Sequence, residues 1–306
     1  MMKKFIVPLI SLSLLALAFT ACNPDEDDPK DDPNKQQEEI FVSKTAQNRN
    51  VLIEEFTGIG CQFCPVGHRM TDSLADLYEG NCFHINVHAG DYANGKTPLL
   101  TTTEGNELLS GFKDETGYPT GLTGRMYWNV NNKKAFCWNP AYFPTLVNQI
   151  LTTMPAYVNV AAKTTIEKSS GKLTCKVQAY FTDNPTTDST INLINIAILQ
   201  NNIKGPQSGG SKYYPEMWDG TAYSHNHALR AYITGFSGEE IPVNAKDSLY
   251  SKTFTYDIPA TLGLGNVDVV YEDLEILVFV TEKKVANNKV YGVPVINVNK
   301  SAITIK

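Results

Sequence analysis

Two cysteines separated by two residues are the first candidates for chemistry in this sequence. Cys61 and Cys64 stand in the stretch GCQFCPVGH, directly after a β-prone run. Such a pair can exchange disulfides, because one thiolate attacks a substrate disulfide and the second cysteine resolves the mixed disulfide. The alternative is a structural disulfide in an exported protein. A disulfide that closes so short a loop removes little entropy from the unfolded chain and so adds little stability, which favours the redox interpretation.

A strand and a helix flank the cysteine pair. Residues 51–56, VLIEEF, predict the strand, and Pro65 suits the first turn of the helix that follows. Amide groups and the dipole at a helix start stabilise a thiolate, which is the reactive form of cysteine. Gly80 is a stop signal for this helix. Its apolar residues recur at helical spacing and predict the buried face: Val66, Met70, Leu74 and Leu77.

The next run, CFHINVHAG, predicts a second strand parallel to the first. Its far end, at His88, would then lie at the edge of the sheet that carries the cysteine pair. His88 there is either a participant in the site or a solvated polar side chain. Downstream, Asn131-Asn132 favours a hairpin, and Asn139 with Pro140 predicts the start of a helix.

This order of elements resembles the thioredoxin family, which includes the protein disulfide isomerases. The stretches VLIEEFTGIGCQFC and GYPT carry the resemblance, which covers about residues 48–154. Two positions depart from the family pattern, because Gly60 replaces a Trp and Pro65 stands where a Lys is frequent. The resemblance implies four catalytic residues: Glu55 as a buried acid that ferries a proton, Cys61 as the attacking cysteine, Cys64 as the resolving cysteine, and Pro119 as the cis-proline.

The remaining cysteines of the mature chain carry no predicted chemistry. Cys82 and Cys137 would have to span the sheet to form a bridge, so we expect none. Cys175 alternates with apolar residues and is expected to be a buried free thiol. No second CxxC and no convergent ligand pair lies near Cys61 and Cys64, which argues against zinc. No cofactor is predicted.

From residue 155 the pattern changes to successive β-runs, which predict an antiparallel, immunoglobulin-like β-sandwich over 155–306. A long aromatic-rich insertion interrupts them, and such insertions are usually functional or disordered. His225 and His227 would face one side of an extended chain, but no third metal ligand can be named, so no metal site is predicted. The candidate binding residues of the insertion are His225, His227, Arg230 and Trp218. Its aromatic side chains form either a recognition surface or part of the domain core.

The N-terminus predicts export and anchoring. Residues 1–21 combine two lysines, an apolar stretch and small residues, as in a signal peptide. Residues 19–22, FTAC, resemble a bacterial lipobox, so Cys22 is the expected lipid anchor. Residues 22–47 are expected to be a disordered tether. Between Cys22 and Glu39, eight acids stand against two lysines. This acidic run is either a spacer or, by resemblance, a signal that sends some lipoproteins to the cell surface.

Composition limits the remaining possibilities. The chain has 306 residues, 19% of them charged, and a net charge of -6, nearly all of which lies in the tether. This profile is that of a globular protein of two domains. There is no surplus of basic residues that would neutralise phosphates, so nucleic acid is not an expected partner.

The combination of lipobox, acidic tether, cysteine pair and β-rich half with HNHALR resembles the outer membrane protein 28 family of bacterial lipoproteins. It implies anchorage in the outer membrane and a thioredoxin-like α/β domain followed by an all-β sandwich domain. Two functions remain open. The first is a thiol-disulfide oxidoreductase that acts on protein disulfides at the cell surface. The second is a non-catalytic surface protein that binds or adheres to an extracellular protein ligand.

Overall fold

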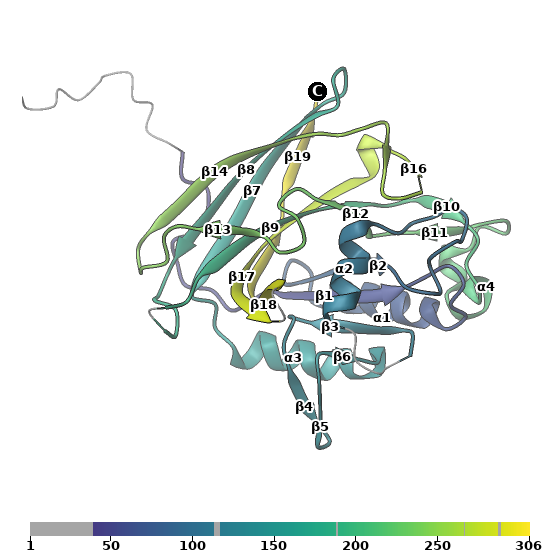
Figure 1. Ribbon diagram of the computed structural model, residues 1–306, viewed down its shortest axis with the longest axis horizontal. Helices are drawn as coiled ribbons and strands as arrows, with labels where there is room; N and C mark the ends of the chain where they lie inside the picture. Colours follow the sequence, from purple (N-terminus) through teal and green to yellow (C-terminus); the bar gives the residue numbers. More distant parts are fainter. Residues whose placement is uncertain (1–38, 113–116, 188, 266, 287–288) are drawn as a thin grey trace, which may run out of the picture. The chain divides into compact units, whose positions relative to one another are not determined.

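The computed structural model describes residues 39–112, 117–187, 189–265, 267–286 and 289–306 (Figure 1). Residues 40–306 form one compact unit. It contains helices and many strands in several sheets, as the predicted combination of α/β and β-rich parts requires. The signal peptide, Cys22 and the acidic run up to Glu38 lie outside the described residues.

The first half supplies an α/β layer. β1 is parallel to β2 and antiparallel to β3, which in turn pairs with β6. The elements of this half are β1 (Val51–Thr57), α1 (Cys64–Leu77), β2 (Cys82–His88), α2 (Thr103–Phe112), β3 (Thr120–Thr123), β4 (Trp128–Val130), β5 (Lys133–Ala135), β6 (Cys137–Trp138), the 3₁₀ helix η1 (Pro140–Tyr142) and α3 (Phe143–Thr153).

The second half is mostly strand. Its elements are β7 (Val158–Glu167), β8 (Lys172–Phe181), β9 (Asn192–Gln200), β10 (Ile203–Gly205), α4 (Gly210–Tyr213), the 3₁₀ helix η2 (Pro215–Met217), β11 (Tyr223–His225), β12 (Ala228–Tyr232), β13 (Glu239–Ile241), β14 (Leu249–Asp257), β15 (Thr261–Leu262), β16 (Val267–Asp268), the 3₁₀ helix η3 (Tyr271–Asp273), β17 (Leu274–Ala286), β18 (Lys289–Lys300) and β19 (Ala302–Ile305).

One nine-stranded sheet runs through both halves. Its order is β18-β17-β9-β12-β2-β1-β3-β6, with β13 paired to β9. The junction is the contact of β12 with β2, where Ala228 pairs in parallel with Asn86. Five strands of the second half, β9, β12, β13, β17 and β18, therefore continue the sheet that the first half begins.

The other long strands of the second half form a four-stranded sheet, β14-β8-β7-β19, which packs on β9 and β17 of the nine-stranded sheet (Figure 1). Alternating apolar residues of β7 and β8 pack on those of β9 and β17, for example Val177 and Phe181 against Ile196 and Val278. This gives two layers, as in a sandwich. The layer is not wholly antiparallel, because β19 is parallel to β7.

The helices cover both faces of the nine-stranded sheet in the first half. Val51 and Ile53 face the core that α1 and α3 complete, whereas Leu52 and Phe56 face the core that α2 completes. This alternation follows from the two-residue period of a strand. Odd-numbered residues of β1 therefore face α1, and even-numbered residues face α2.

Part of the expected tether is attached to the fold. The backbone N–H groups of Phe41 and Val42 donate to the side chain of Gln178, and Val42 is buried. The side chain of Asn159 donates to the carbonyl oxygens of Ser43 and Thr45. The chain is thus held against β7 and β8 from about residue 41.

Candidate functional site

Cys61 and Cys64 form a disulfide at the junction of β1 and α1. Cys64 is the first residue of α1, Pro65 follows in its first turn, and Cys61 lies in the loop just before. Both cysteines are buried, with 2% of Cys61 and none of Cys64 exposed. The pair therefore has the expected place at a helix start, but it is closed to solvent.

A segment of the second half, residues 205–214, closes the disulfide. The side chain of Gln207 donates to the carbonyl oxygen of Cys61 at 2.9 Å, and the backbone N–H of Ser208 donates to that of Ile59 at 2.9 Å. Gly209 has a φ of 71°, and a Cβ there would lie 2.1 Å from the carbonyl oxygen of Gln62. Only glycine allows this close approach. We call residues 205–214 the covering segment.

Glu55 faces α1 beneath the cysteine pair. It is fully buried, and neither carboxylate oxygen has a hydrogen-bond partner among the described residues. Gly67 leaves the room for it, because a Cβ at this position would lie 1.9 Å from Oε1 of Glu55. Burial, with a smaller contribution from the charge of Asp72, raises the pKa of Glu55 well above 4.5. The group is therefore a buried acid that holds its proton.

Glu54 faces the opposite side of the sheet, as the alternation of a strand requires. Both of its oxygens accept hydrogen bonds of 2.6 Å from Arg125, and the hydroxyl of Tyr232 donates to Oε1. This bidentate pair is buried. The two neighbouring glutamates thus have different roles, because Glu54 is a paired charge and Glu55 is an unpaired acid.

Pro119 lies next to the end of β1. The Tyr118–Pro119 peptide bond is cis, and the following residue, Thr120, pairs with Phe56. The hydroxyl of Tyr118 donates to the carbonyl oxygen of Ala89, just after β2. The loop before β3 therefore reaches the same edge of the sheet as the disulfide.

Beneath α1 lies a buried layer of polar side chains. His84, Asn86 and His88 alternate along β2 and face α1, so the strand places three polar groups in one row. The second half contributes three more from β11 and the residues after it. All five histidines of the chain belong to this polar layer, which consists of Glu55, Thr57, His68, Thr71, Asp72, His84, Asn86, His88, Tyr223, His225 and His227.

His68 links the two halves through hydrogen bonds. Its Nε2 is bonded to the Thr57 hydroxyl at 2.8 Å, and its Nδ1 is bonded to the Tyr223 hydroxyl at 2.9 Å. Burial, followed by the proximity of His225, lowers the pKa of His68 to about 3. A neutral imidazole carries one donor and one acceptor, so this ring satisfies both partners without a charge.

His88 is the last residue of β2 and pairs with Thr57 of β1. Its ring lies 5.3 Å from that of His225, between centroids, and neither of its nitrogens has a partner among the described residues. Burial and the neighbouring His225 lower the pKa of His88 well below 6.5. The interpretation of His88 as a solvated side chain is therefore wrong. The burial of this ring next to the disulfide edge keeps it among the candidates for the site.

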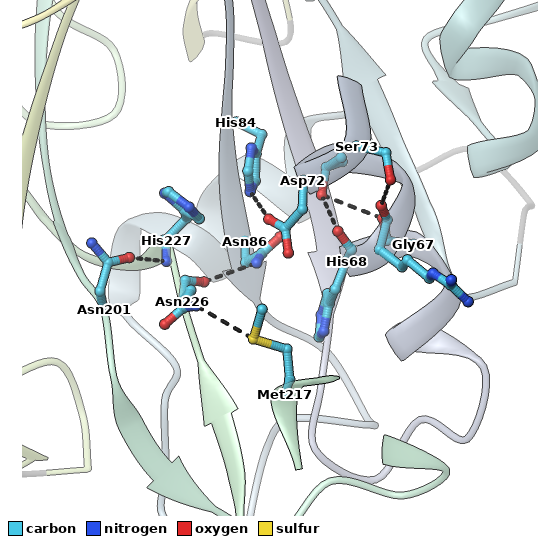
Figure 2. A network of polar contacts seen from close by, with 12 residues as sticks. Gly67, His68, Asp72, Ser73, His84, Asn86, Asn201, Met217, Asn226 and His227 are labelled. Carbon is cyan, nitrogen blue, oxygen red and sulfur yellow. Dashed lines mark hydrogen bonds and ion pairs between the residues drawn. The ribbon is translucent and has the colours of Figure 1, made fainter. Parts of the chain in front are cut away.

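The far end of the layer gathers an acid and two imidazoles (Figure 2). Asp72 of α1 points toward His84 of β2, with Oδ1 3.0 Å from Nε2. The rings of His84 and His227 are 4.2 Å apart. Ligand atoms of all three residues lie within 4.8 Å of one another, which makes them the group of described residues able to hold a metal ion.

The residues predicted in the insertion do not form one site. His225 ends β11 and lies against His88, whereas His227 has a φ of 50° and lies against His84. The chain between them is not extended, yet both rings reach the row of polar side chains on β2 that faces α1. Arg230 is buried and donates to the carbonyl oxygens of Leu100 and Leu262, so it supports loops of the core.

The aromatic side chains of the insertion divide between packing and exposure. Tyr214 and Tyr223 are buried, and the Tyr214 hydroxyl donates to Asp72 at 2.8 Å. Trp218 is partly buried and forms a backbone bridge with Tyr223. Tyr213 packs against Phe63, whose side chain is 52% exposed, with 5.4 Å between ring centroids. Of the insertion's aromatic residues, Tyr213 therefore contributes to an exposed aromatic pair beside the disulfide.

The three other described cysteines are buried and form no disulfide, and Cys175 is a buried free thiol as expected. Burial raises the pKa of Cys82 to about 12 and that of Cys175 to about 11. Cys137 donates through its thiol to the carbonyl oxygen of Phe112. No bridge between Cys82 and Cys137 exists in the described structure, and these thiols are poor nucleophiles.

Sequence reasoning missed Asp72, His68 and His84. Two signals for them were present. His68 and Asp72 are four residues apart and share one helix face, and CFHINVH places polar residues at every second position of a buried strand. A polar stripe on an otherwise apolar strand marks a face that meets other polar groups.

The family model of outer membrane protein Omp28 matches residues 109–306. The chain belongs to the Omp28 family. This confirms the predicted family and the predicted location at the outer membrane as a lipoprotein. Among the described residues, no helix combines the length and apolar character needed to span a bilayer.

A solved structure shares the fold of this chain over most of its length. HBP35 of Porphyromonas gingivalis has 20% identity and a TM-score of 0.61, over 84% of this chain and 76% of its own. A domain of the outer membrane lipoprotein Omp28 from the same organism has 20% identity and a TM-score of 0.29, over 49% and 91%. A protein from Agrobacterium tumefaciens has 10% identity and a TM-score of 0.49, over 84% and 96%. No curated protein matches the chain.

Proposed function

We propose that this outer membrane lipoprotein carries out thiol-disulfide exchange through Cys61 and Cys64, within a thioredoxin-like arrangement of β1, α1, β2 and β3. The observation that carries the proposal is Glu55, an unpartnered, fully buried acid with a raised pKa on the α1 side of β1. A structural disulfide needs no such group, whereas exchange needs a proton donor and acceptor for the departing thiolate.

In the oxidising direction, the cysteine pair converts two substrate thiols into a disulfide and is itself reduced. A substrate thiolate attacks Sγ of Cys61, the Cys61–Cys64 bond breaks, and the Cys64 thiolate takes up the proton of Glu55. A second substrate thiolate then displaces Cys61, which leaves a substrate disulfide and a reduced cysteine pair. In the reducing direction the same steps run backwards, and Glu55 accepts the proton of Cys64. The start of α1 stabilises the thiolates.

The covering segment must move before a protein substrate reaches Cys61. Its contacts at the disulfide consist of a few hydrogen bonds, among them that of Gln207 with Cys61. Phe63 and Tyr213 form an aromatic pair beside it that suits an apolar part of a protein substrate. The site would thus open when a substrate displaces the segment.

The reduction potential of the pair tests the proposal, measured on the full chain by equilibration with glutathione buffers. An exchange enzyme has a potential of roughly -120 to -270 mV, and its attacking cysteine has a pKa well below about 8.5. We expect Glu55→Gln to slow exchange, and Glu79→Gln, at an exposed position of the same region, to leave it unchanged. A potential below about -300 mV would contradict the proposal.

The second candidate is a non-catalytic surface protein that binds an extracellular protein. The burial of both cysteines under the covering segment favours it, since a closed disulfide suits a structural role. This candidate places the domains on the outer face of the membrane, with Cys22 as anchor and the acidic run as signal. Protease treatment of intact cells tests that placement. Degradation only after lysis would exclude it.

A further inference from the structure

Three side chains of types that can ligate a metal, from distant parts of the chain, meet at the far end of the polar layer. Asp72 comes from α1, His84 comes from β2, and His227 precedes β12 (Figure 2). Their ligand atoms lie within 4.8 Å of one another. The cysteine pair does not take part in this group, so the inference stands apart from the proposed exchange.

The spacing fits a common ion. Zinc ligands lie about 2.0–2.2 Å from the metal, which at a tetrahedral angle puts neighbouring ligand atoms about 3.3–3.6 Å apart. Asp72 Oδ1 and His84 Nε2 are 3.0 Å apart, and the rings of His84 and His227 are tilted by 57° with 4.2 Å between their centroids. The ligand atoms lie within 4.8 Å of one another, so side-chain shifts of about 1 Å would bring the three donors to the tetrahedral spacing around one ion.

Two ring nitrogens in the group have no well-directed hydrogen bond among the described residues. They are Nε2 of His84, despite its short distance to Asp72, and Nδ1 of His227. The His84 side chain is 2% exposed. Each nitrogen lies beside a carboxylate, Nε2 of His84 at 3.0 Å from Asp72 and Nδ1 of His227 at 3.4 Å from Glu275. Two imidazoles between two acids form an environment that favours a cation.

Neighbouring groups hold the three donors in place. The Tyr214 hydroxyl donates to Oδ2 of Asp72 at 2.8 Å, which leaves Oδ1 for the group. The backbone of His227 has a φ of 50° and donates to Asn201 at 2.7 Å. Oε2 of Glu275 lies 3.4 Å from Nδ1 of His227. Carboxylates and hydroxyls that orient ligands in this way are typical of metal sites.

The group is accessible from solvent. A pocket of about 360 Å³ is lined by His84, His227 and Glu275, and Lys300 at its mouth is bonded to Glu275. About a quarter of the His227 side chain is exposed. An ion can therefore enter without unfolding of the layer, and the open side leaves room for a water ligand.

We propose that Asp72, His84 and His227 bind a divalent transition-metal ion, with zinc as the ion that suits them best. Two imidazoles and one carboxylate match the donor preference of zinc and its neighbours, whereas magnesium and calcium prefer oxygen donors alone. The bound ion joins α1 and β2 of the first half to the residue just before β12 in the second. Three protein ligands leave a fourth position for water or an external donor.

Titration of the oxidised full chain with Zn²⁺ and with Co²⁺ tests this site. Calorimetry should give one ion per chain, and Co²⁺ should show visible absorption of tetrahedral intensity without a thiolate charge-transfer band. Asp72→Asn and His227→Asn should each weaken binding at least about tenfold, since ligand-orienting changes alone reach that size. Asn tolerates the positive φ at residue 227. Asp76→Asn, an exposed position one turn along α1, is the matched control and should leave the affinity unchanged.

Equal affinities in all variants would overturn the proposal, because the ion would then sit elsewhere, for example on the acidic run near the N-terminus. Binding of less than one ion per chain would overturn it as well. X-ray absorption of the zinc-loaded wild type gives a test that does not depend on folding of the variants. Two imidazoles without sulfur would support the site, whereas sulfur ligands or no imidazole would refute it.

Discussion

Replacing Glu55 with glutamine should change how the stability of the protein depends on pH. Glutamine has the same shape but does not titrate. Burial raises the pKa of Glu55 well above 4.5, so the folded protein binds this proton more tightly than the unfolded chain does. Its stabilising effect is fully present below pH 4.5 and is lost as the pH rises toward the folded pKa.

The size of the effect follows from one linked proton. Between pH 4.5 and the folded pKa, the free energy of unfolding should fall by about 1.4 kcal/mol per pH unit relative to Glu55→Gln. The side chain is fully buried, so solvent screening does not reduce this slope. Near pH 4.5 and below, the two proteins should differ only by a constant.

Urea unfolding of the oxidised protein, at half-unit steps from about pH 4 to 8, measures the slope. A metal chelator should be present throughout, so that the proposed ion does not contribute. Glu79→Gln is the control, because its carboxylate is exposed. If the curves of the wild type and Glu55→Gln run parallel, Glu55 does not hold its proton in the folded state. The reasoning about its catalytic role would then fail.

Three further predictions concern the covering segment, the buried ion pair of Glu54 with Arg125, and the buried neutral ring of His68. Gln207→Ala removes the hydrogen bond to Cys61, worth about 1 kcal/mol, and should speed reduction by a soluble dithiol about fivefold; an unchanged rate would show that the segment does not limit access. Arg125→Met leaves Glu54 as an unpaired buried charge and should lower the free energy of unfolding by about 3–5 kcal/mol in urea. A loss below about 1 kcal/mol would contradict the buried pair. His68 has a pKa lowered to about 3 by burial, so the protein should lose stability as the pH falls below 6.5. His68→Gln should reduce that loss by up to about 1.4 kcal/mol per pH unit, measured by urea unfolding, and an identical acid slope would argue against a buried neutral ring.

Features set by neighbouring residues were predictable from the sequence. Asn139 caps its helix, with its side chain accepting from the N–H of Ala141. Asn131 and Asn132 both have positive φ, at 50° and 63°, and form the predicted hairpin. The disulfide lies between a strand and a helix as expected. Each of these depends on local backbone preference, which a single sequence expresses.

The buried face of α1 was predicted only in part. Leu74 is buried and Met70 packs against the core as expected, but Val66 and Leu77 are 42% and 70% exposed. The buried face also contains Gly67, His68 and Thr71. Periodicity assumes that the core is apolar, and this helix packs on a polar layer. The partners that satisfy the layer come from residues about 150 positions later, which no local pattern reveals.

That both halves share one sheet could not be predicted from the sequence either. The β-rich pattern after residue 155 correctly indicated strands, but it did not indicate that β12 pairs with β2. Strand pairing between distant segments depends on tertiary packing rather than on the composition of either strand. The same pairing places His225 and His227 against β2, so the site and the sheet escaped prediction for one reason.

The polar layer explains why the two halves form one structure. A buried polar group is stable only with its partner, and several partners in this layer lie across the junction of the halves. His68 needs Tyr223, and Asp72 needs Tyr214, both from the insertion. Separation of the halves would leave these groups unpaired. The insertion therefore acts as part of the site rather than as a loop on its surface, since the same stretch of chain covers the disulfide and completes the group around Asp72.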